Sequence, residues 1–175
     1  DLLNKRRQQK NLPASRSPNC RLAHASGGLF NDGSSKPLVQ GGGAGIGIYV
    51  DVRPPGSLID SICVHITTAS TNYHAELAGI VECLNYIHEN VHSTDCPIAV
   101  ILCDCQQAIR DVCQGHTSFP DAHQLIRKAQ RLMRSLHESA VLVYIDWIPG
   151  HVGADGNERA DALAKRSLSK QCLNG

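Results

Sequence analysis

The sequence predicts an α/β domain built on a five-stranded mixed sheet, with three antiparallel strands, two parallel strands and helices on both faces. Three strand-like segments separated by turn residues come first. A long helical pattern follows them, and strand and helix patterns then alternate to the end of the chain. This order is typical of a mixed sheet packed between helices. The 175 residues, 42% of them hydrophobic, are enough for one domain with a buried core.

Residues 1–26 are polar, basic and aperiodic, and we expect them to form a disordered linker. They contain six basic residues and one acidic residue, so the remaining 149 residues have a net charge of −4 although the whole chain has +1. A solvated tether and an arm that contacts nucleic acid both remain open for this segment. Because the body is acidic, the sequence does not indicate a protein that grips nucleic acid through bulk charge.

The hydropathy of the chain and its first and last residues indicate which kind of protein to expect. No apolar run approaches the roughly 18 residues of a membrane span, and no signal peptide precedes the fold, so we expect no membrane partner. The chain starts with Asp rather than Met, and we therefore expect it to be a piece of a longer protein. Residues 171–175 form a short C-terminal tail after a domain that we place at residues 27–170.

The first three strands are expected at residues 28–34, 46–50 and 57–67. The glycine-rich stretch 41–45 does not match a phosphate-binding loop, because a strand pattern rather than a helix pattern follows it. Residues 54–56, Pro-Pro-Gly, predict a turn. The third segment alternates in polarity and places His65 on its more polar face, where we expect solvent exposure.

Residues 72–90 give the strongest helical pattern, with apolar residues at helical spacing and Glu76 near the first turn. A carboxylate there is also explained by the helix dipole alone. Residues 98–104 form a nearly continuous apolar run that ends in Asp104, as expected of a central strand covered on both faces. Ligands bind at such strand ends, and a buried Asp needs a metal ion or hydrogen bonds. A helix is expected at 105–114.

Residues 121–138 predict another helix, and residues 141–148 predict a further strand. Basic residues lie on or near one face of that helix, among them Arg127 and Arg131. A solvated face and a phosphate-contacting face are both compatible with this pattern.

The stretch 147–164 combines a loop His with a helix start. Asp155 and Glu158 have the spacing of a capping box, which places Asp161 in the first two turns of the last helix. His151 lies ten positions before Asp161 on a glycine-flanked loop. A mobile His beside a fixed carboxylate suits a proton or product shuttle at a metal site. A simple loop His and a helix-dipole Asp remain the alternative.

The eight cysteines include no C-x-x-C pair, and several lie in apolar periodic runs. Free thiols in a reducing intracellular compartment, the nucleus or the cytoplasm, explain them better than disulfides or zinc. Cys103 and Cys105 flank Asp104, but on a strand their thiols would point away from it.

Four carboxylates are expected to converge if the first and fourth strands are neighbours: Asp32, Glu76, Asp104 and Asp161. Carboxylates this close repel one another unless cations lie between them. Two divalent ions would neutralise them and would clamp the attacking and leaving oxygens of a phosphoryl displacement. Carboxylate and water oxygens select Mg²⁺ or Mn²⁺ rather than Zn²⁺.

Four segments then give the chain a family resemblance: N-D-G-S at 31–34, N-Y-H-A-E-L at 72–77, C-D-C-Q at 103–106, and G-H through N-E-R-A-D at 150–161. With these motifs, residues 27–169 resemble a type 1 ribonuclease H domain. The segments W-I-P-G-H-V-G and A-D-A-L-A-K are similar to ribonuclease H domains of retroelements, particularly non-LTR retrotransposons. The fold that the resemblance implies is the ribonuclease H-like fold.

The resemblance implies hydrolysis of the RNA strand of RNA–DNA hybrids, leaving a 3′-hydroxyl and a 5′-phosphate. By position, it implies that Asp32, Glu76, Asp104 and Asp161 hold two Mg²⁺ ions, for which Mn²⁺ can substitute, and act in catalysis. One ion would activate the water and the other would stabilise the leaving 3′ oxygen. His151 would assist proton transfer or product release.

The implied substrate contacts are Gly33, Ser34, Asn72 and Gln106. Asn72 and Gln106 match positions that touch the RNA strand around its 2′-hydroxyls, the group that distinguishes RNA from DNA. Two positions depart from the family pattern, because Asn31 stands where Thr is commoner and Tyr73 replaces a frequent second Asn.

Between Asp104 and Trp147 there is no long basic, Trp-rich protrusion of the kind that helps some family members bind hybrid. We therefore expect the domain, a monomer in isolation, to depend on a neighbour such as a reverse transcriptase domain of the same polyprotein. Arg127 and Arg131 are candidates for partial compensation.

Two other functions remain open from the sequence. A non-catalytic module of this fold would bind nucleic acid or protein without cutting, and a transposase or integrase core shares the fold. Metal titration tests the first, and a panel of hybrid and duplex DNA substrates tests the second.

Overall fold

The computed structural model describes residues 28–35, 44–51, 59–66, 71–90, 98–150 and 152–168. The predicted linker at 1–26, the predicted turn at 54–56 and the tail at 171–175 lie outside these described residues.

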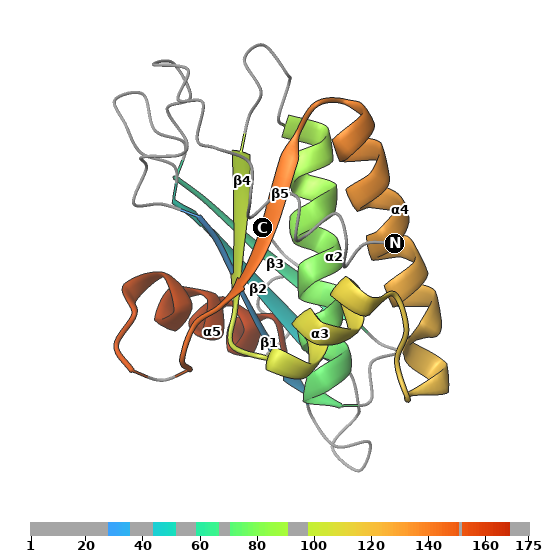
Figure 1. Cartoon of the computed structure of the whole chain (residues 1–175). Helices are drawn as coiled ribbons and strands as arrows, with labels where there is room; N and C mark the ends of the chain where they lie inside the picture. The colour runs from blue at the N-terminus through green and yellow to red at the C-terminus, as the bar shows by residue number, and fades with distance from the viewer. Residues whose placement is uncertain are drawn as a thin grey trace.

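The sheet has five strands in the order β3-β2-β1-β4-β5 (Figure 1). Their bounds are Leu29–Ser35 for β1, Ala44–Asp51 for β2, Ile59–Ile66 for β3, Ile98–Cys103 for β4 and Leu142–Trp147 for β5. β1 pairs with β2 and β2 pairs with β3 in antiparallel fashion, whereas β1–β4 and β4–β5 are parallel. The predicted fold class, a mixed sheet with three antiparallel and two parallel strands, is confirmed. His65 on β3 is exposed, as expected.

The helices cover both faces of this sheet. Their bounds are Asn72–Asn90 for α2, Gln106–Gln114 for α3, His123–Glu138 for α4 and Asp155–Leu168 for α5. α2, α3 and α4 lie on one side, and α5 lies on the other (Figure 1). α4 begins two residues later than predicted because Pro120–Ala122 form a short 3-10 helix, η3. None of the helices described here is both long and apolar enough to cross a membrane.

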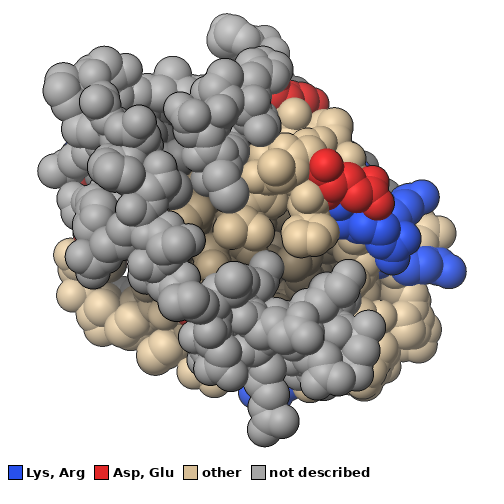
Figure 2. Space-filling model, turned by 45° about the horizontal axis from the view of Figure 1, so that its top comes forward, with Lys and Arg blue, Asp and Glu red and all other residues tan. Residues whose placement is uncertain are grey.

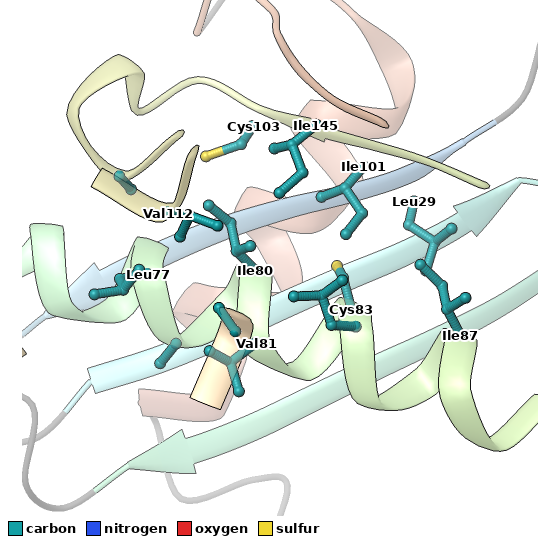
Figure 3. Close-up of a cluster of buried hydrophobic side chains, with 14 of the residues drawn as sticks. Leu29, Leu77, Ile80, Val81, Cys83, Ile87, Ile101, Cys103, Val112 and Ile145 are labelled. Atoms are coloured by element: carbon teal, nitrogen blue, oxygen red, sulfur yellow. The ribbon is translucent and has the colours of Figure 1, made fainter. Parts of the chain in front are cut away.

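The main core lies between α2 and the sheet. The predicted apolar face of α2 is buried, and its Leu77, Ile80 and Ile87 belong to one buried cluster with Ile101 and Ile145 of the parallel strands (Figure 3). Each fully buried aliphatic side chain contributes about 1.5–3 kcal/mol of transfer free energy. This packing holds the N-terminal half of α2 against β1 and thereby sets the position of Glu76.

α5 packs on the opposite face, over β1, β2 and β3. Its buried residues Ala160 and Ala164 are small, and Gly156 lies directly against the ring of Phe30. Small residues allow the helix to approach the strands closely. Asp161 is thereby brought to the β1 side of the sheet.

Two local predictions are wrong. The predicted capping box requires Asp155 to precede the helix, but α5 begins at Asp155, and the N–H of Glu158 donates to the carbonyl of Ala154 at 3.0 Å. The carboxylate of Asp155 accepts from Arg159 Nε at 3.0 Å instead. An acid in the first turn still favours the helix dipole.

The second correction concerns the cysteines. Cys83, Cys103, Cys105 and Cys113 are free, as expected, and burial is the main cause of the raised pKa of the first three thiols. Cys63 on β3, however, is disulfide-bonded, contrary to the expectation of free thiols throughout.

Candidate active site

The sheet brings Asp32 and Asp104 to the same edge. β1 and β4 are parallel neighbours with Asn31 opposite Cys103, and each of the two aspartates comes one residue later. Asp32 is buried, with 6% of its surface exposed, and Asp104 is half-buried. Because the carboxyl ends of parallel strands form the ligand-binding edge of such sheets, this placement favours a functional site. The predicted convergence of these two aspartates is confirmed.

α2 adds Glu76, which β1 holds through hydrogen bonds. The N–H of Gly33 donates to Glu76 Oε1 at 2.7 Å, and Asn31 Nδ2 donates to Oε2 at 3.2 Å and to the Glu76 carbonyl at 3.3 Å. The Cys103 thiol lies 3.6 Å from the same Oε2. A Cβ at Gly33 would overlap the backbone N of Glu76, so the close approach of α2 requires glycine there.

The pKa of Glu76 reflects both its burial and its charged neighbours. Burial raises its pKa well above the ordinary value, and the negative charges of Asp32 and then Asp104 raise it further, although the Gly33 N–H opposes the shift. Burial and these two charges therefore favour the protonated form of Glu76. A cation bound between these carboxylates would compensate their negative charge.

α5 contributes Asp161, which is paired with a lysine one turn later. Lys165 Nζ lies 2.6 Å from Asp161 Oδ2, and the Asp161 side chain is only 14% exposed. Its hydrogen bond to Asp161 is the main cause of the raised pKa of Lys165, and the charge of Asp32 raises that pKa as well. Lys165 thus contacts Asp161 and feels the charge of Asp32, while Glu76 feels the charges of Asp32 and Asp104.

The loop after β5 lies against Asp104. The indole N–H of Trp147 donates to the Asp104 carbonyl at 2.9 Å, and a Cβ at Gly150 would overlap Asp104 Oδ2. The next residue, His151, lies outside the described residues, so its catalytic role stays a prediction.

The predicted substrate contacts divide into two groups. Asn72 accepts from the N–H and the hydroxyl of Ser35 at 3.0 and 2.7 Å, which holds it beside the end of β1, where Gly33 and Ser34 also lie. Gln106 is exposed at the first position of α3, and only Asp104 and Cys105 separate it from the end of β4. These residues border the carboxylates.

Arg127 and Arg131 form the second group. Both are exposed on α4, which packs against α2 and β5 and not at the ends of β1 and β4. Figure 2 shows basic side chains gathered at the right-hand edge of the view, on the side where α4 lies in Figure 1. The structure therefore does not bring these arginines to the carboxylates, and they can act only as a separate contact surface.

Tyr73 has a structural environment that its sequence position did not predict. Its hydroxyl donates to the buried Asp111 at 2.7 Å and lies 2.9 Å from the Thr117 hydroxyl, while Gln107 donates to the other Asp111 oxygen. The ring packs on Phe119 with centroids 4.6 Å apart. Burial is the main cause of the raised pKa of Tyr73. These contacts fasten the N-terminus of α2 to α3 and the following loop.

Sequence reasoning missed two residues at the site. Asn31 is fully buried and positions Glu76, but the sequence offered only a departure from a commoner Thr. Lys165 could have been found, because a Lys four residues after an Asp on a helix predicts an ion pair.

The donor set fits a hard divalent cation. The four side chains offer carboxylate oxygens, which Mg²⁺ and Mn²⁺ prefer, and the pKa of Glu76 is raised first by burial and then by the negative charges of Asp32 and Asp104. Within the described residues, no three His, Cys, Asp or Glu side chains close a cage by themselves. Mg²⁺ is commonly held by one or two carboxylates together with water and substrate phosphates, so an open arrangement is compatible with it.

Known proteins resemble this chain in sequence pattern and in fold. A family model described as RNase H matches residues 25–169. RNase H1 from the halophilic archaeon Halobacterium salinarum NRC-1 superimposes with a TM-score of 0.63 at 22% identity, covering 82% of this chain and 97% of that one. Prototype foamy virus protease–reverse transcriptase superimposes with a TM-score of 0.65 at 16% identity, covering 87% of this chain and 22% of that one.

A further structure, the foamy viral protease–reverse transcriptase in complex with an RNA/DNA hybrid, gives a TM-score of 0.63 at 14% identity, covering 90% and 22% of the two chains. At these identities the structural matches show the fold. No curated protein sequence matches the chain.

Proposed function

The chain belongs to the ribonuclease H family, and from this premise we propose that it is a metal-dependent endonuclease that hydrolyses the RNA strand of RNA–DNA hybrids. The observation that supports this most directly is that Asp32 and Asp104, each one residue beyond the last β1–β4 pair, both place negative charge beside the buried Glu76. Carboxylates from three elements at one edge are expensive for a fold to maintain unless they serve a cation.

Asp32, Glu76, Asp104 and Asp161 are the proposed ligands of two Mg²⁺ ions, which Mn²⁺ can replace. Bound there, the ions would supply Lewis-acid stabilisation of the reacting phosphate and a lowered pKa for water. The protein's own contribution is positioning. Gly33 and Asn31 hold the Glu76 carboxylate from two sides, so it is already oriented before substrate arrives.

The bordering polar residues are proposed to select the RNA strand. Asn72 is held by Ser35 and is exposed, and Gln106 is exposed on α3. Both can reach sugar hydroxyls, and a 2′-hydroxyl offers both a donor and an acceptor. His151 follows Gly150, which lies against Asp104, and it is the proposed proton carrier.

A reverse transcriptase domain of the same polyprotein, in a retroelement, is the proposed partner. The foamy virus structures with this fold are protease–reverse transcriptase chains, and one of them is described in complex with an RNA/DNA hybrid. Arg127 and Arg131 are exposed on α4, away from the carboxylates. A neighbouring domain would therefore add substrate affinity that these two residues cannot supply at the carboxylates.

The test is cleavage of an end-labelled RNA–DNA hybrid in Mg²⁺ and, separately, in Mn²⁺. Wild type is expected to cut only the RNA strand and to leave 5′-phosphates. Asp104→Asn should reduce the rate about a hundredfold or more, because metal ions contribute several kcal/mol to such reactions. Asp146→Asn, a matched change at an exposed residue of β5, should leave the rate unchanged. Hybrid binding without cleavage in either metal would instead support a non-catalytic module.

A further inference from the structure

Lys165 is the last residue of the A-D-A-L-A-K segment and lies one helical turn after Asp161, which belongs with Asp32, Glu76 and Asp104 to the predicted carboxylate cluster. Its ammonium is 2.6 Å from Asp161 Oδ2, and its charge also interacts with Asp32 and with Glu158. Asp161 and Lys165 are on α5, whereas Asp32 is on β1. The lysine therefore acts on carboxylates from two elements.

An ordinary helix pair at this spacing would have a smaller effect. Solvent-exposed pairs four residues apart add little to the stability of the helix that carries them. Here the carboxylate partner is only 14% exposed, so its charge is poorly screened by water. The Lys165 ammonium beside Asp161 reduces the repulsion among the carboxylates. A bound divalent ion would have the same effect.

We propose that Lys165 is a built-in counter-ion that occupies the Asp161 side of the carboxylate cluster in the metal-free protein and competes with the divalent cation there. The inference rests on the proposed function in one respect, because it takes Asp161 to be a metal ligand. A metal ion bound at Oδ2, the oxygen that Lys165 contacts, would be repelled by the ammonium group beside it.

The side chain of Lys165 can make that exchange. It is 62% exposed, so its ammonium can leave for solvent without crossing the core. Its four-carbon stem is flexible, and an ammonium is a compact charge without the fixed two-pronged geometry of arginine. In the metal-free protein Lys165 would thus stabilise Asp161, and when a metal ion binds, the lysine would move into solvent and leave the Asp161 carboxylate to the ion.

The experiment compares wild type with Lys165→Met, Lys165→Arg and Lys128→Met. Lys128 pairs with Glu82 at 3.8 Å between α4 and α2, so its replacement removes the same net charge away from the cluster. Mn²⁺ binding is measured by calorimetric titration, and thermal unfolding is measured with EDTA and with saturating Mg²⁺.

Lys165→Met is expected to bind Mn²⁺ about threefold to tenfold more tightly than wild type, because a repelling charge has been removed from the ion's position. It should also unfold at a lower temperature than wild type in EDTA, and Mg²⁺ should remove that difference. Lys165→Arg should restore metal-free stability close to wild type, and Lys128→Met should leave Mn²⁺ affinity unchanged.

Unchanged or weaker Mn²⁺ binding in Lys165→Met, with wild-type binding and hybrid cleavage intact, would overturn the counter-ion role alone. Equal tightening in Lys128→Met would also overturn it, because the effect would then be one of net charge. Absence of both Mn²⁺ binding and hybrid cleavage in wild type would overturn the proposed function, and the competition with it.

Discussion

The N–H of Gly33 donates a 2.7 Å hydrogen bond to Glu76 Oε1, and so the end of β1 fixes a carboxylate carried by α2. The same glycine leaves the space in which α2 approaches the strand. One residue thus determines both where the helix lies and how its Glu is oriented.

Gly33→Ala should therefore destabilise the protein and disturb the site together. Its Cβ would overlap the backbone N of Glu76 and come within 2.6 Å of the Ala75 Cβ, and backbone atoms there cannot rotate away. Overpacking of this kind costs about 1–3 kcal/mol, which lowers the melting temperature by about 2–4 °C per kcal/mol in a protein of this size. Circular dichroism melts test this. Gly28→Ala is the milder control, because its Cβ would lie 3.2 Å from Leu102 Cδ1. Equal melting of both variants would contradict the steric argument.

Glu76→Gln should stabilise the metal-free protein at neutral pH. Because the pKa of Glu76 is raised in the folded state, the folded protein binds the proton more tightly than the unfolded chain does. Stability is therefore lost as pH rises from the ordinary glutamate pKa of 4.5 through the folded pKa, and the loss is complete above it. Each pKa unit corresponds to about 1.4 kcal/mol.

Gln cannot ionise, and its oxygen can still accept from Gly33. Melts in EDTA should show Glu76→Gln above wild type at about pH 8 and close to it at about pH 4. The exposed substitution Glu138→Gln serves as the control. A Glu76→Gln protein that melts lower than wild type at every pH would show that hydrogen bonding outweighs charge at this position.

Tyr73→Phe should destabilise the junction between α2 and α3. The change removes a hydroxyl donor from Asp111, whose surface is only 2% exposed, and leaves Gln107 as its remaining side-chain donor. Such a loss costs about 1–3 kcal/mol. Urea unfolding is the measurement, with Tyr144→Phe on the exposed face of β5 as the matched control. Identical midpoints for the two variants would argue against the network.

Arg127→Ala with Arg131→Ala should weaken hybrid binding and flatten its dependence on salt. Both side chains are exposed on α4, and each phosphate contact that is lost should reduce the slope of log affinity against log salt by about one. Binding is measured by fluorescence anisotropy over a salt series. Arg166→Ala, exposed on α5, is the charge control. Unchanged affinity at low salt would exclude this face from the substrate contact.

The strand order and the positions of the acids were predictable because they depend on patterns along the chain. Asp104 ends the fourth strand pattern and Asp32 lies in the second half of the first, and parallel pairing of β1 with β4 then brings them together. The details that were missed depend on contacts between elements that are distant in sequence, or on the exact residue at which a helix begins. Asn31 positions Glu76 across 45 residues of sequence, and no local pattern indicates that bond.

The start of α5 shows the same limit on a local scale. Asp155 has the spacing of a capping residue, but the side chain of Arg159 offers it a competing partner within the helix. Disulfide bonding of Cys63 was also beyond reach, because composition alone predicts a reducing environment for all eight cysteines.

The hydrogen bond from Trp147 to the Asp104 carbonyl gives this protein an intrinsic optical probe. Trp147 is the single tryptophan of the chain, and it is 48% exposed. Its fluorescence therefore comes from one indole that is tethered to the backbone of a proposed metal ligand. Occupation of the proposed site by an ion or by a hybrid strand should change the intensity or the wavelength of that emission, so that binding there can be followed in real time without a label.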